Sequence, residues 1–340
     1  MVRGRVTLNQ VAERAGVSPA TVSKVMNGRV GVGAATREAI EKLVDELGYV
    51  GISETERPIR RQRDPLVELI IDSFENPYSL MIIAGATTAA ETSGVTIATG
   101  RLTTPAREDP VRWAERIARS GRVGVVEVTS RFSTAREAAL RAVGLPAVFI
   151  DPLDVPRVAV YSVGATNWAG GVDATRHLAA LGHRRIAFIG GATGAACDLA
   201  RRQGYATALE EYGLPYDPSL VVDGSRSFDE GGAITAALLS QRNPPTAIFT
   251  SSDVTALGAL DAARKLGVSV PDQLSIVGFD DIPFTSMSPP PLTTVHQPIR
   301  EIGQAAVAMV MGLAAGQPPP TRRIELATHL VVRGSTAPRP

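Results

Sequence analysis

The first fifty positions place apolar residues at helical spacing in three short runs. In the first run the apolar positions follow an i, i+3, i+4, i+7 pattern: Leu8, Val11, Ala12 and Ala15. That spacing predicts one apolar face of a short helix, with Thr7 as its N-cap and Gly16 as its end. Residues 1–50 are therefore expected to form a small helical domain.

A second helix is predicted to start after Ser18, with Pro19 at its first position, where a missing N–H group costs nothing. Its expected inner face consists of Val22, Val25 and Met26. Its outward face carries small, polar or basic side chains: Ala20, Thr21, Ser23, Lys24 and Asn27. A third apolar run at the same spacing covers residues 40–47.

Two short helices joined by a three-residue turn are typical of a helix-turn-helix, although a plain three-helix bundle is the alternative. The plain bundle does not explain why Lys24 is the one large side chain on the outward face of the second helix. A helix that enters a DNA major groove ~12 Å wide needs such a slim face.

From Leu66 onward, short apolar runs alternate with helical stretches. The expected strands are Leu66–Ile71, Val95–Ala98, Val123–Val128, Pro146–Ile150, Arg185–Gly190, Ala247–Thr250 and Leu274–Phe279. The expected helices include Pro77–Ser93, Pro110–Arg119, Trp168–Leu181, Leu199–Tyr212 and Val254–Leu266. This alternation predicts an α/β fold with parallel sheets covered on both faces. About 270 residues exceed one typical domain, so two lobes are expected.

Composition places the chain among soluble globular proteins, with 44% hydrophobic and 20% charged residues. The start lacks the apolar stretch of a secretory signal, and no window approaches the ~18 apolar residues of a membrane span. The single cysteine, Cys197, fits a reducing compartment, so a cytoplasmic protein is expected. The four histidines have no metal-ligand spacing, and neither a metal nor a cofactor is expected.

The charge is unevenly distributed along the chain. Residues 1–64 contain 11 Lys and Arg against 8 Asp and Glu, whereas the remainder is slightly acidic. A basic N-terminal part suits a polyanionic partner such as double-stranded DNA.

The stretch from Val6 to Asn27, continued by Thr36-Arg37 and Leu47-Gly-Tyr49, resembles the DNA-binding headpiece of the lactose/galactose repressor family. The resemblance implies that Pro19, Ala20 and Lys24 read bases, while Thr21, Ser23 and Asn27 contact phosphates. The full set of expected DNA-binding residues is Thr7, Ser18, Pro19, Ala20, Thr21, Ser23, Lys24, Asn27, Arg29, Ile59, Arg60 and Arg61.

Residues 51–65 are polar and carry two prolines, as expected of a linker. In the family, a hinge helix here wedges a leucine into the minor groove, and this chain has Pro58 at that position. Ile59 is the nearest apolar substitute, and Arg60 and Arg61 could follow the phosphates. Whether the hinge forms a helix stays open.

Five further segments resemble the effector domain of the same family: Leu181–Gly191, Arg201–Tyr205, Ser252–Gly258, Val277–Asp281 and Pro291–Pro298. The resemblance implies an effector domain over 66–340 with the fold of periplasmic sugar-binding proteins. The chain would cross between its two lobes near 162, 293 and 320. Lobe 1 would comprise 66–161 and 293–320, and lobe 2 would comprise 162–292 and 321–340.

The effector is expected between the lobes, where polar groups follow the strand ends. By resemblance, Arg201 and Asp280 match the charged pair that grips the ligand, and Phe228 matches an aromatic that stacks on a sugar face. The other expected contacts are Phe74, Tyr78, Asp151, Trp168, Ser252, Asp253 and Gln297.

The resemblance implies a homodimeric transcriptional repressor whose operator affinity changes with a bound small molecule, a sugar being the commonest class. An activator, or a response to a purine or another metabolite, remains open. An enzyme is disfavoured because Gly190–Gly194 lacks the Lys-Ser/Thr of a P-loop. A transport-type binding protein would need a secretory signal.

Overall fold

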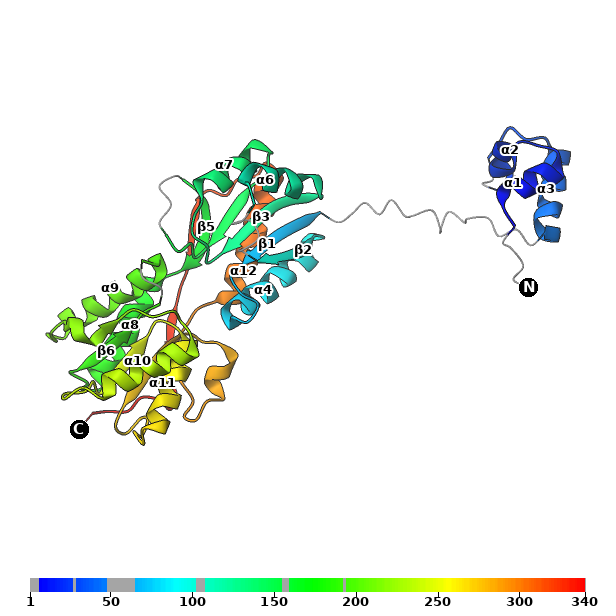
Figure 1. Cartoon of the computed structure of the whole chain (residues 1–340). Coiled ribbons are helices and arrows are strands. Elements are labelled where there is room, and N and C mark those ends of the chain that lie inside the picture. Colours follow the sequence, from blue (N-terminus) through cyan, green and yellow to red (C-terminus); the bar gives the residue numbers. More distant parts are fainter. Residues whose placement is uncertain are drawn as a thin grey trace. The chain divides into compact units, whose positions relative to one another are not determined.

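The computed structural model describes residues 6–26, 29–47, 65–101, 108–154, 159–191 and 194–339. The chain divides into two compact units, Met1–Arg63 and Asp64–Pro340 (Figure 1). Asn27 and the linker residues Ile59, Arg60 and Arg61 lie outside the described residues, so their expected DNA contacts remain predictions.

The first unit contains three helices, α1 (Leu8–Ala15), α2 (Pro19–Met26) and α3 (Ala34–Leu47). Its core consists of Val11, Ala12, Val22, Val25 and Ile40. Thr7 begins α1 with a capping box, since Thr7 N donates to Gln10 Oε1 at 2.8 Å and Gln10 N donates back to the Thr7 hydroxyl. Gly16 ends α1 with a φ of 64°.

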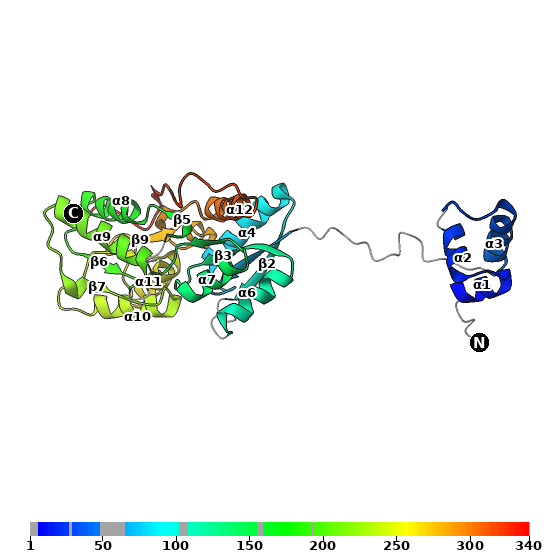
Figure 2. The ribbon, with the colours of Figure 1, turned by 90° about the horizontal axis from the view of Figure 1, so that it is seen from above.

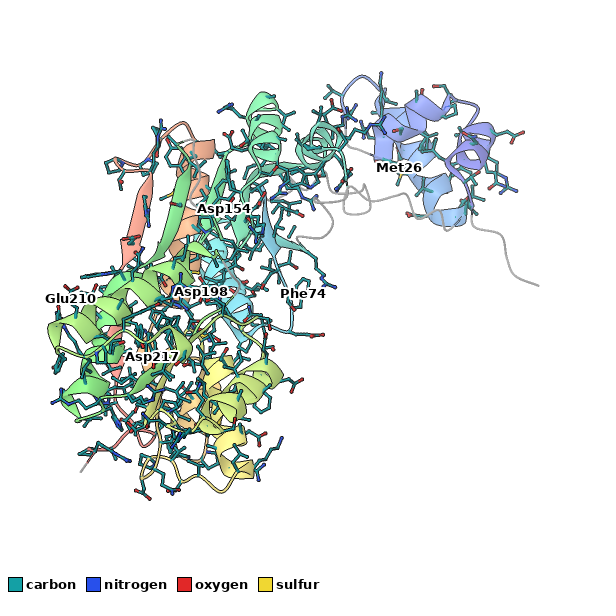
Figure 3. The ribbon with its side chains drawn as sticks, turned by 60° about the vertical axis from the view of Figure 1, so that its left-hand side comes forward. Met26, Phe74, Asp154, Asp198, Glu210 and Asp217 are labelled. Atoms are coloured by element: carbon teal, nitrogen blue, oxygen red, sulfur yellow. The ribbon has the colours of Figure 1, made fainter. Side chains whose placement is uncertain are left out.

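The prediction that Met26 lies on the inner face of α2 is wrong, because its side chain is exposed (Figure 3). Met26 is the last residue of α2, where Arg37 of α3 covers the helix end. The Arg37 guanidinium donates to Arg29 O at 2.7 Å and to Val25 O at 3.4 Å. The bond to Val25 O pairs a carbonyl group that the end of α2 leaves without a helical partner, and the bond to Arg29 O holds a residue beyond the helix.

Lobe 1 of the second unit is built on a six-stranded parallel sheet in the order β11-β5-β4-β3-β1-β2. Its strands are β1 (Leu66–Ile71), β2 (Thr96–Arg101), β3 (Arg122–Val128), β4 (Ala147–Ile150), β5 (Tyr161–Ala165) and β11 (Arg323–Leu326). One face is covered by α4 (Pro77–Ser93) and α12 (Ile299–Ala314), and the other by α6 (Pro110–Arg119) and α7 (Thr134–Ala142) (Figure 2).

Lobe 2 repeats this three-layer plan with a sheet in the order β12-β10-β9-β8-β6-β7. Its strands are β6 (Ile186–Ile189), β7 (Val221–Val222), β8 (Ala247–Thr250), β9 (Ser275–Asp280), β10 (Thr293–His296) and the antiparallel β12 (His329–Val331). Its helices are α8 (Asn167–Ala180) and α9 (Ala196–Glu211) on one face, with α10 (Phe228–Leu239) and α11 (Asp253–Lys265) on the other. The predicted two-lobed α/β fold with a helical headpiece is confirmed.

The chain crosses between the lobes after β5, after β10 and after β11. Each crossing falls a few residues later than the expected positions near 162, 293 and 320, because each of these strands first completes its pairing. Two crossings lie side by side: Thr166 N donates to Leu326 O at 3.0 Å, and Thr328 N donates to the Thr166 hydroxyl at 2.9 Å. They form a hydrogen-bonded pair of hinge segments.

Glycines allow α8 and α9 to pack closely in lobe 2. A Cβ atom at Gly171 would lie 2.3 Å from Arg201 O, and one at Gly204 would lie 2.2 Å from Trp168 O. The backbones of the two helices therefore meet at the positions that present Arg201 and Trp168.

Candidate functional site

A small cavity of about 50 Å³ lies between the lobes at the carboxyl ends of the strands, and we call it the central cavity. Lobe 1 contributes Asn76, Tyr78, Thr129 and Asp151 to its lining. Lobe 2 contributes Cys197, Arg201, Arg226, Ser252, Val254 and Asp280. In an open α/β sheet this is the edge at which ligands bind.

Arg201 of α9 is buried, with 4% of its surface exposed. Its Nε donates to Asn167 Oδ1 at 2.8 Å, and its Nη1 donates to the carbonyl of Ser251. Its guanidinium stacks 3.7 Å from the ring centre of Phe279, and Nη1 lies 3.8 Å from Asp280 Oδ1. Arg201 thus joins the start of α8, directly after the first crossing, to the ends of β8 and β9.

The two aspartates of the central cavity have separate partners. Asp280 Oδ1 accepts from Gln297 Nε2 at 2.6 Å, and Gln297 lies on the second crossing. Asp151 Oδ2 accepts from the Tyr78 hydroxyl at 2.6 Å within lobe 1. Asn167 Nδ2 donates to Ala165 O at 3.1 Å, and the charge of Arg201 acts on Asp151 from the lobe 2 side of the cavity.

Arg226 is a cavity residue that the sequence analysis missed. It follows the two-residue strand β7, which is too short to give an apolar run. Its guanidinium pairs with Asp198 of α9 and donates to Cys197 Sγ at 3.0 Å. The described residues of the central cavity therefore contribute two guanidinium groups and two carboxylates to its lining.

Backbone strain is concentrated at this cavity. Among the described residues, the non-glycine residues with positive φ are Thr129, Asp151, Arg226, Asp280 and Asp281. The first four line the central cavity, and Asp281 follows Asp280 in the chain. Such conformations cost on the order of 1–3 kcal/mol each and cluster at functional sites. The side-chain oxygen of Thr129 is also buried without a hydrogen-bond partner.

Burial shifts the acid–base properties of the carboxyl groups here. It raises the pKa of Asp280 to about 6, against the opposing charges of Arg201 and Arg226. Burial also raises the pKa of Asp151, while the hydrogen bond from Tyr78 and the charge of Arg201 oppose the shift. Removing a carboxylate from water disfavours its charged form, and nearby guanidinium groups partly restore it.

Asp253 does not line the central cavity. It is fully buried at the start of α11, where Oδ1 accepts from the Thr294 hydroxyl at 2.6 Å and Oδ2 from Ile282 N at 2.9 Å. Burial, followed by the charge of Asp280, raises its pKa to about 8. Both side-chain oxygens of Asp253 accept hydrogen bonds from other segments of lobe 2, so the structure gives Asp253 a role in stabilising that lobe. The neighbouring Ser252 caps α11 and does line the cavity.

The three exposed aromatic residues proposed from sequence lie apart from the central cavity. Phe228 lines a groove between α10 and α11 in lobe 2. Phe74 is 44% exposed in the loop before α4 and lines none of the cavities described here (Figure 3). Trp168 lines a second, larger cavity next to the central one.

The headpiece presents α2 much as the sequence indicated. Pro19, Ala20 and Lys24 are exposed, and Thr21 and Ser23 are half-buried. The Ser18 hydroxyl accepts from Thr21 N at 3.2 Å, so Ser18 is the N-cap of α2. The exposed surface of this helix therefore consists of small side chains together with Lys24, its one described cation, and Met26 at the helix end.

None of the helices in the described part of the chain is both long and apolar enough to cross a membrane. Nor do the described residues contain three His, Cys, Asp or Glu side chains grouped as metal ligands.

Two family models match the chain. Residues 7–51 match the bacterial regulatory proteins of the lacI family, and residues 175–336 match the periplasmic binding protein-like domain. The first match covers the three helices of the headpiece. The second covers most of lobe 2 and the lobe 1 elements α12 and β11.

Relatives and solved structures match the chain over both the headpiece and the two-lobed domain. The HTH-type transcriptional regulator CelR of Thermobifida fusca is 34% identical over 98% of this chain and 99% of its own length. The solved CelR–cellobiose complex has a TM-score of 0.72 at 33% identity and covers 97% of this chain and 100% of that one. The lac repressor dimer bound to operator and the anti-inducer ONPF has a TM-score of 0.70 at 27% identity, covering 98% and 99%.

The raised pKa of Asp253 predicts a pH dependence of stability. Its folded pKa of about 8 lies above the ordinary 3.8, so the folded state holds a proton that the unfolded state releases. Stability should therefore fall as pH rises from about 4 to about 8. Asp253→Asn should make this decline shallower, as measured by thermal unfolding across that range.

Asp217→Asn is the matched control. Hydrogen bonds from Ser219 and then Arg185 lower the pKa of Asp217 to about 2, so its contribution is lost only as pH falls below about 4. This variant should leave the slope between pH 4 and 8 unchanged. Parallel pH curves for Asp253→Asn and the parent protein would contradict the assignment.

Proposed function

Because the chain belongs to the lacI family of bacterial regulatory proteins, we propose that it is a transcriptional repressor whose operator affinity is set by a small saccharide bound between its lobes. The observation that carries this proposal is the strained, charged central cavity at the junction of two hinged lobes. The slim, exposed α2 of the headpiece supplies the DNA-binding surface.

The proposed DNA contact places α2 in the major groove. Lys24 would donate to a guanine edge, while Pro19 and Ala20 offer apolar contacts to a thymine methyl group. Thr21, Ser23 and Arg29 would fix the helix against phosphates. Thr7 and Ser18 would support DNA binding indirectly, because their hydroxyls cap α1 and α2 and set the orientation of the motif.

We propose a homodimer as the operator-binding form. One headpiece reads only one half-site, and two half-sites about one helical turn apart require two headpieces related by a twofold axis. The similar lac repressor structure contains a dimer on its operator, which supports this arrangement.

A saccharide suits the central cavity because its hydroxyl groups both donate and accept. Arg201 and Arg226 offer donors, while Asp151 and Asp280 offer acceptors. The Thr129 side-chain oxygen adds a group that still lacks a partner. The similarity to the CelR–cellobiose complex favours the same ligand class. Among the described residues of this lining, Tyr78 is the one aromatic side chain, which gives little support to a stacked purine.

The central cavity is too small for a sugar as it stands. A volume of about 50 Å³ approaches that of one or two water molecules, whereas small-molecule sites span roughly 300–1,000 Å³. Binding therefore requires the lobes to separate about the three crossings. This movement would connect the ligand to the geometry of the linker and the headpieces.

Lys24→Ala should weaken binding to the true operator by ~1–3 kcal/mol and relax the preference at one base pair. The measurement is a binding-site selection followed by affinity determination on the selected operator. Lys42→Ala removes an exposed charge from α3 and serves as the control, since it should leave the consensus unchanged. An identical consensus for the parent and Lys24→Ala would refute the base-reading role.

Asp280→Asn and Arg201→Lys should each weaken saccharide binding by about tenfold or more, because each loses a charge-assisted contact. A thermal-shift panel would contain glucose, galactose, xylose, cellobiose, maltose, lactose and xylobiose, with adenosine as the purine comparison. Calorimetry would then give the affinities for the best ligand.

Operator binding reports that these variants are folded, and it should persist without responding to the ligand. Asp173→Asn alters a partly exposed carboxylate of α8 and should respond like the parent protein. Unchanged ligand affinity in both cavity variants would show that the effector binds elsewhere. A response to adenosine alone would replace the saccharide with a purine.

A further inference from the structure

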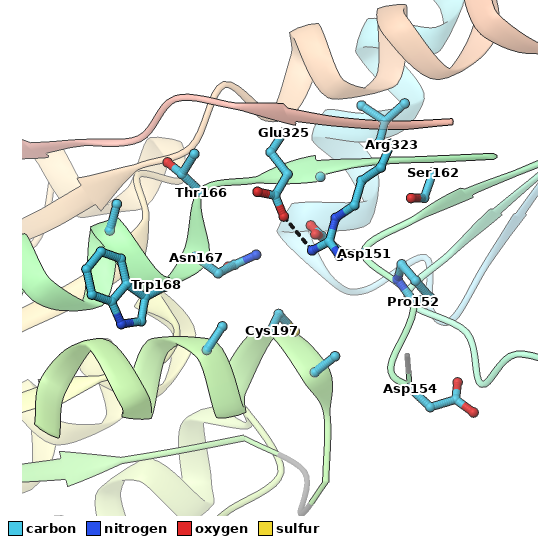
Figure 4. Close-up of a pocket in the computed structure, with 15 residues that line it drawn as sticks. Asp151, Pro152, Asp154, Ser162, Thr166, Asn167, Trp168, Cys197, Arg323 and Glu325 are labelled. Carbon is cyan, nitrogen blue, oxygen red and sulfur yellow. Dashed lines mark hydrogen bonds and ion pairs between the residues drawn. The ribbon is translucent and has the colours of Figure 1, made fainter. Parts of the chain in front are cut away.

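A second cavity of about 350 Å³ lies beside the central one, and we call it the hinge-side cavity (Figure 4). Its lining comes from the segment after β4, from β5 and β11, from the first crossing and the start of α8, and from the start of α9. The residues used below are Asp154, Asn167, Trp168, Arg323 and Glu325. Its volume falls within the usual range of ligand sites.

The two cavities are neighbours. Asp151 and Cys197 line both of them. The hydrogen bond from Arg201 Nε to Asn167 Oδ1 joins a residue that lines the central cavity to one that lines the hinge-side cavity. The proposed function already requires the lobes to separate at this junction. The same separation would join the two cavities into one elongated site.

The hinge-side cavity combines an aromatic face with mixed hydrogen-bonding groups. The Trp168 residue is 49% exposed, whereas Trp113 is 2% exposed in the core of lobe 1. Figure 4 shows Arg323 and Glu325 reaching into the cavity from β11, joined by an ion pair of 2.5 Å. Asn167 points into the same space from the start of α8.

This combination fits a sugar ring better than an anion or an apolar ligand. The carboxylates of Asp151, Asp154 and Glu325 disfavour an anion, and a purely apolar group would leave these polar side chains without partners. A sugar ring can cover an indole with its C–H face while its hydroxyls bond to charged groups at the rim.

We propose that the hinge-side cavity is a second saccharide subsite, so that the effector is an oligosaccharide with one ring in the central cavity and the next against Trp168. This inference rests on the proposed function. It makes the protein selective for chain length, because a monosaccharide fills only the central cavity.

The two tryptophans of the chain give a direct test on the full-length protein. Trp113 is buried, so acrylamide quenching reports mainly on Trp168. Glucose, galactose and xylose should leave the quenching unchanged. A disaccharide among cellobiose, maltose, lactose and xylobiose should protect Trp168 and bind about tenfold more tightly than its component monosaccharide.

Variants separate this subsite from the central cavity. Trp168→Ala should remove the preference for the disaccharide and leave monosaccharide affinity unchanged, as measured by calorimetry. Trp168→Phe should keep most of the preference. Tyr212→Ala, an exposed aromatic residue at the end of α9, is the control and should behave like the parent.

The outcomes distinguish the two proposals. If saccharides bind with no dependence on chain length, or if Trp168→Ala keeps the preference for the disaccharide, the second subsite is wrong and the proposed function stands. If no saccharide of the panel binds, both proposals fail.

Discussion

Arg201 carries a full positive charge into a position where only 4% of its surface is exposed, and a charge in that position must be paired. Its partners come from the elements that meet at the lobe junction. Asn167 is the first residue of α8, directly after the first crossing, while Ser251 and Asp280 lie at the ends of β8 and β9. Losing one partner of a buried charge typically costs about 3–5 kcal/mol, so this side chain fixes the relative positions of these elements.

The same constraint explains how a ligand could act at a distance. The charge of Arg201 acts on Asp151 of lobe 1, and Asp280 is bonded to Gln297 on the second crossing. A sugar that entered the central cavity would exchange some of these bonds for bonds to its own hydroxyls. The crossings would then be free to adopt another arrangement. The ligand would determine whether the backbone strain at the strand ends is released or kept.

The sequence predicted the parts of this architecture that depend on local pattern. Buried parallel strands such as Leu66–Ile71 and Ala247–Thr250 are continuous apolar runs, and the structure contains them at those bounds. Edge strands gave no such signal: β11 reads Arg-Ile-Glu-Leu with exposed charges, and β7 has two residues. The predicted positions of the crossings between the lobes are therefore a few residues too early in the sequence.

The site was harder to predict because it depends on contacts between distant positions. Arg201 and Asp280 were found from the resemblance, and the structure places both in the central cavity. Arg226 was missed because nothing local distinguishes a loop arginine that pairs with Asp198 across the fold. Asp253 follows Ser252 directly, yet its side chain turns into the protein, where Thr294 and Ile282 hold it. Sequence spacing does not reveal that direction.

The central claim is that saccharide binding and operator binding are linked through the lobe junction. Linkage requires the saccharide to change operator affinity by the same factor by which the operator changes saccharide affinity. Titration calorimetry on the free and operator-bound protein would give one factor, and operator titrations with and without saturating saccharide would give the other. The account predicts two equal factors, each different from one. Equal saccharide affinity for the free and operator-bound protein would contradict it.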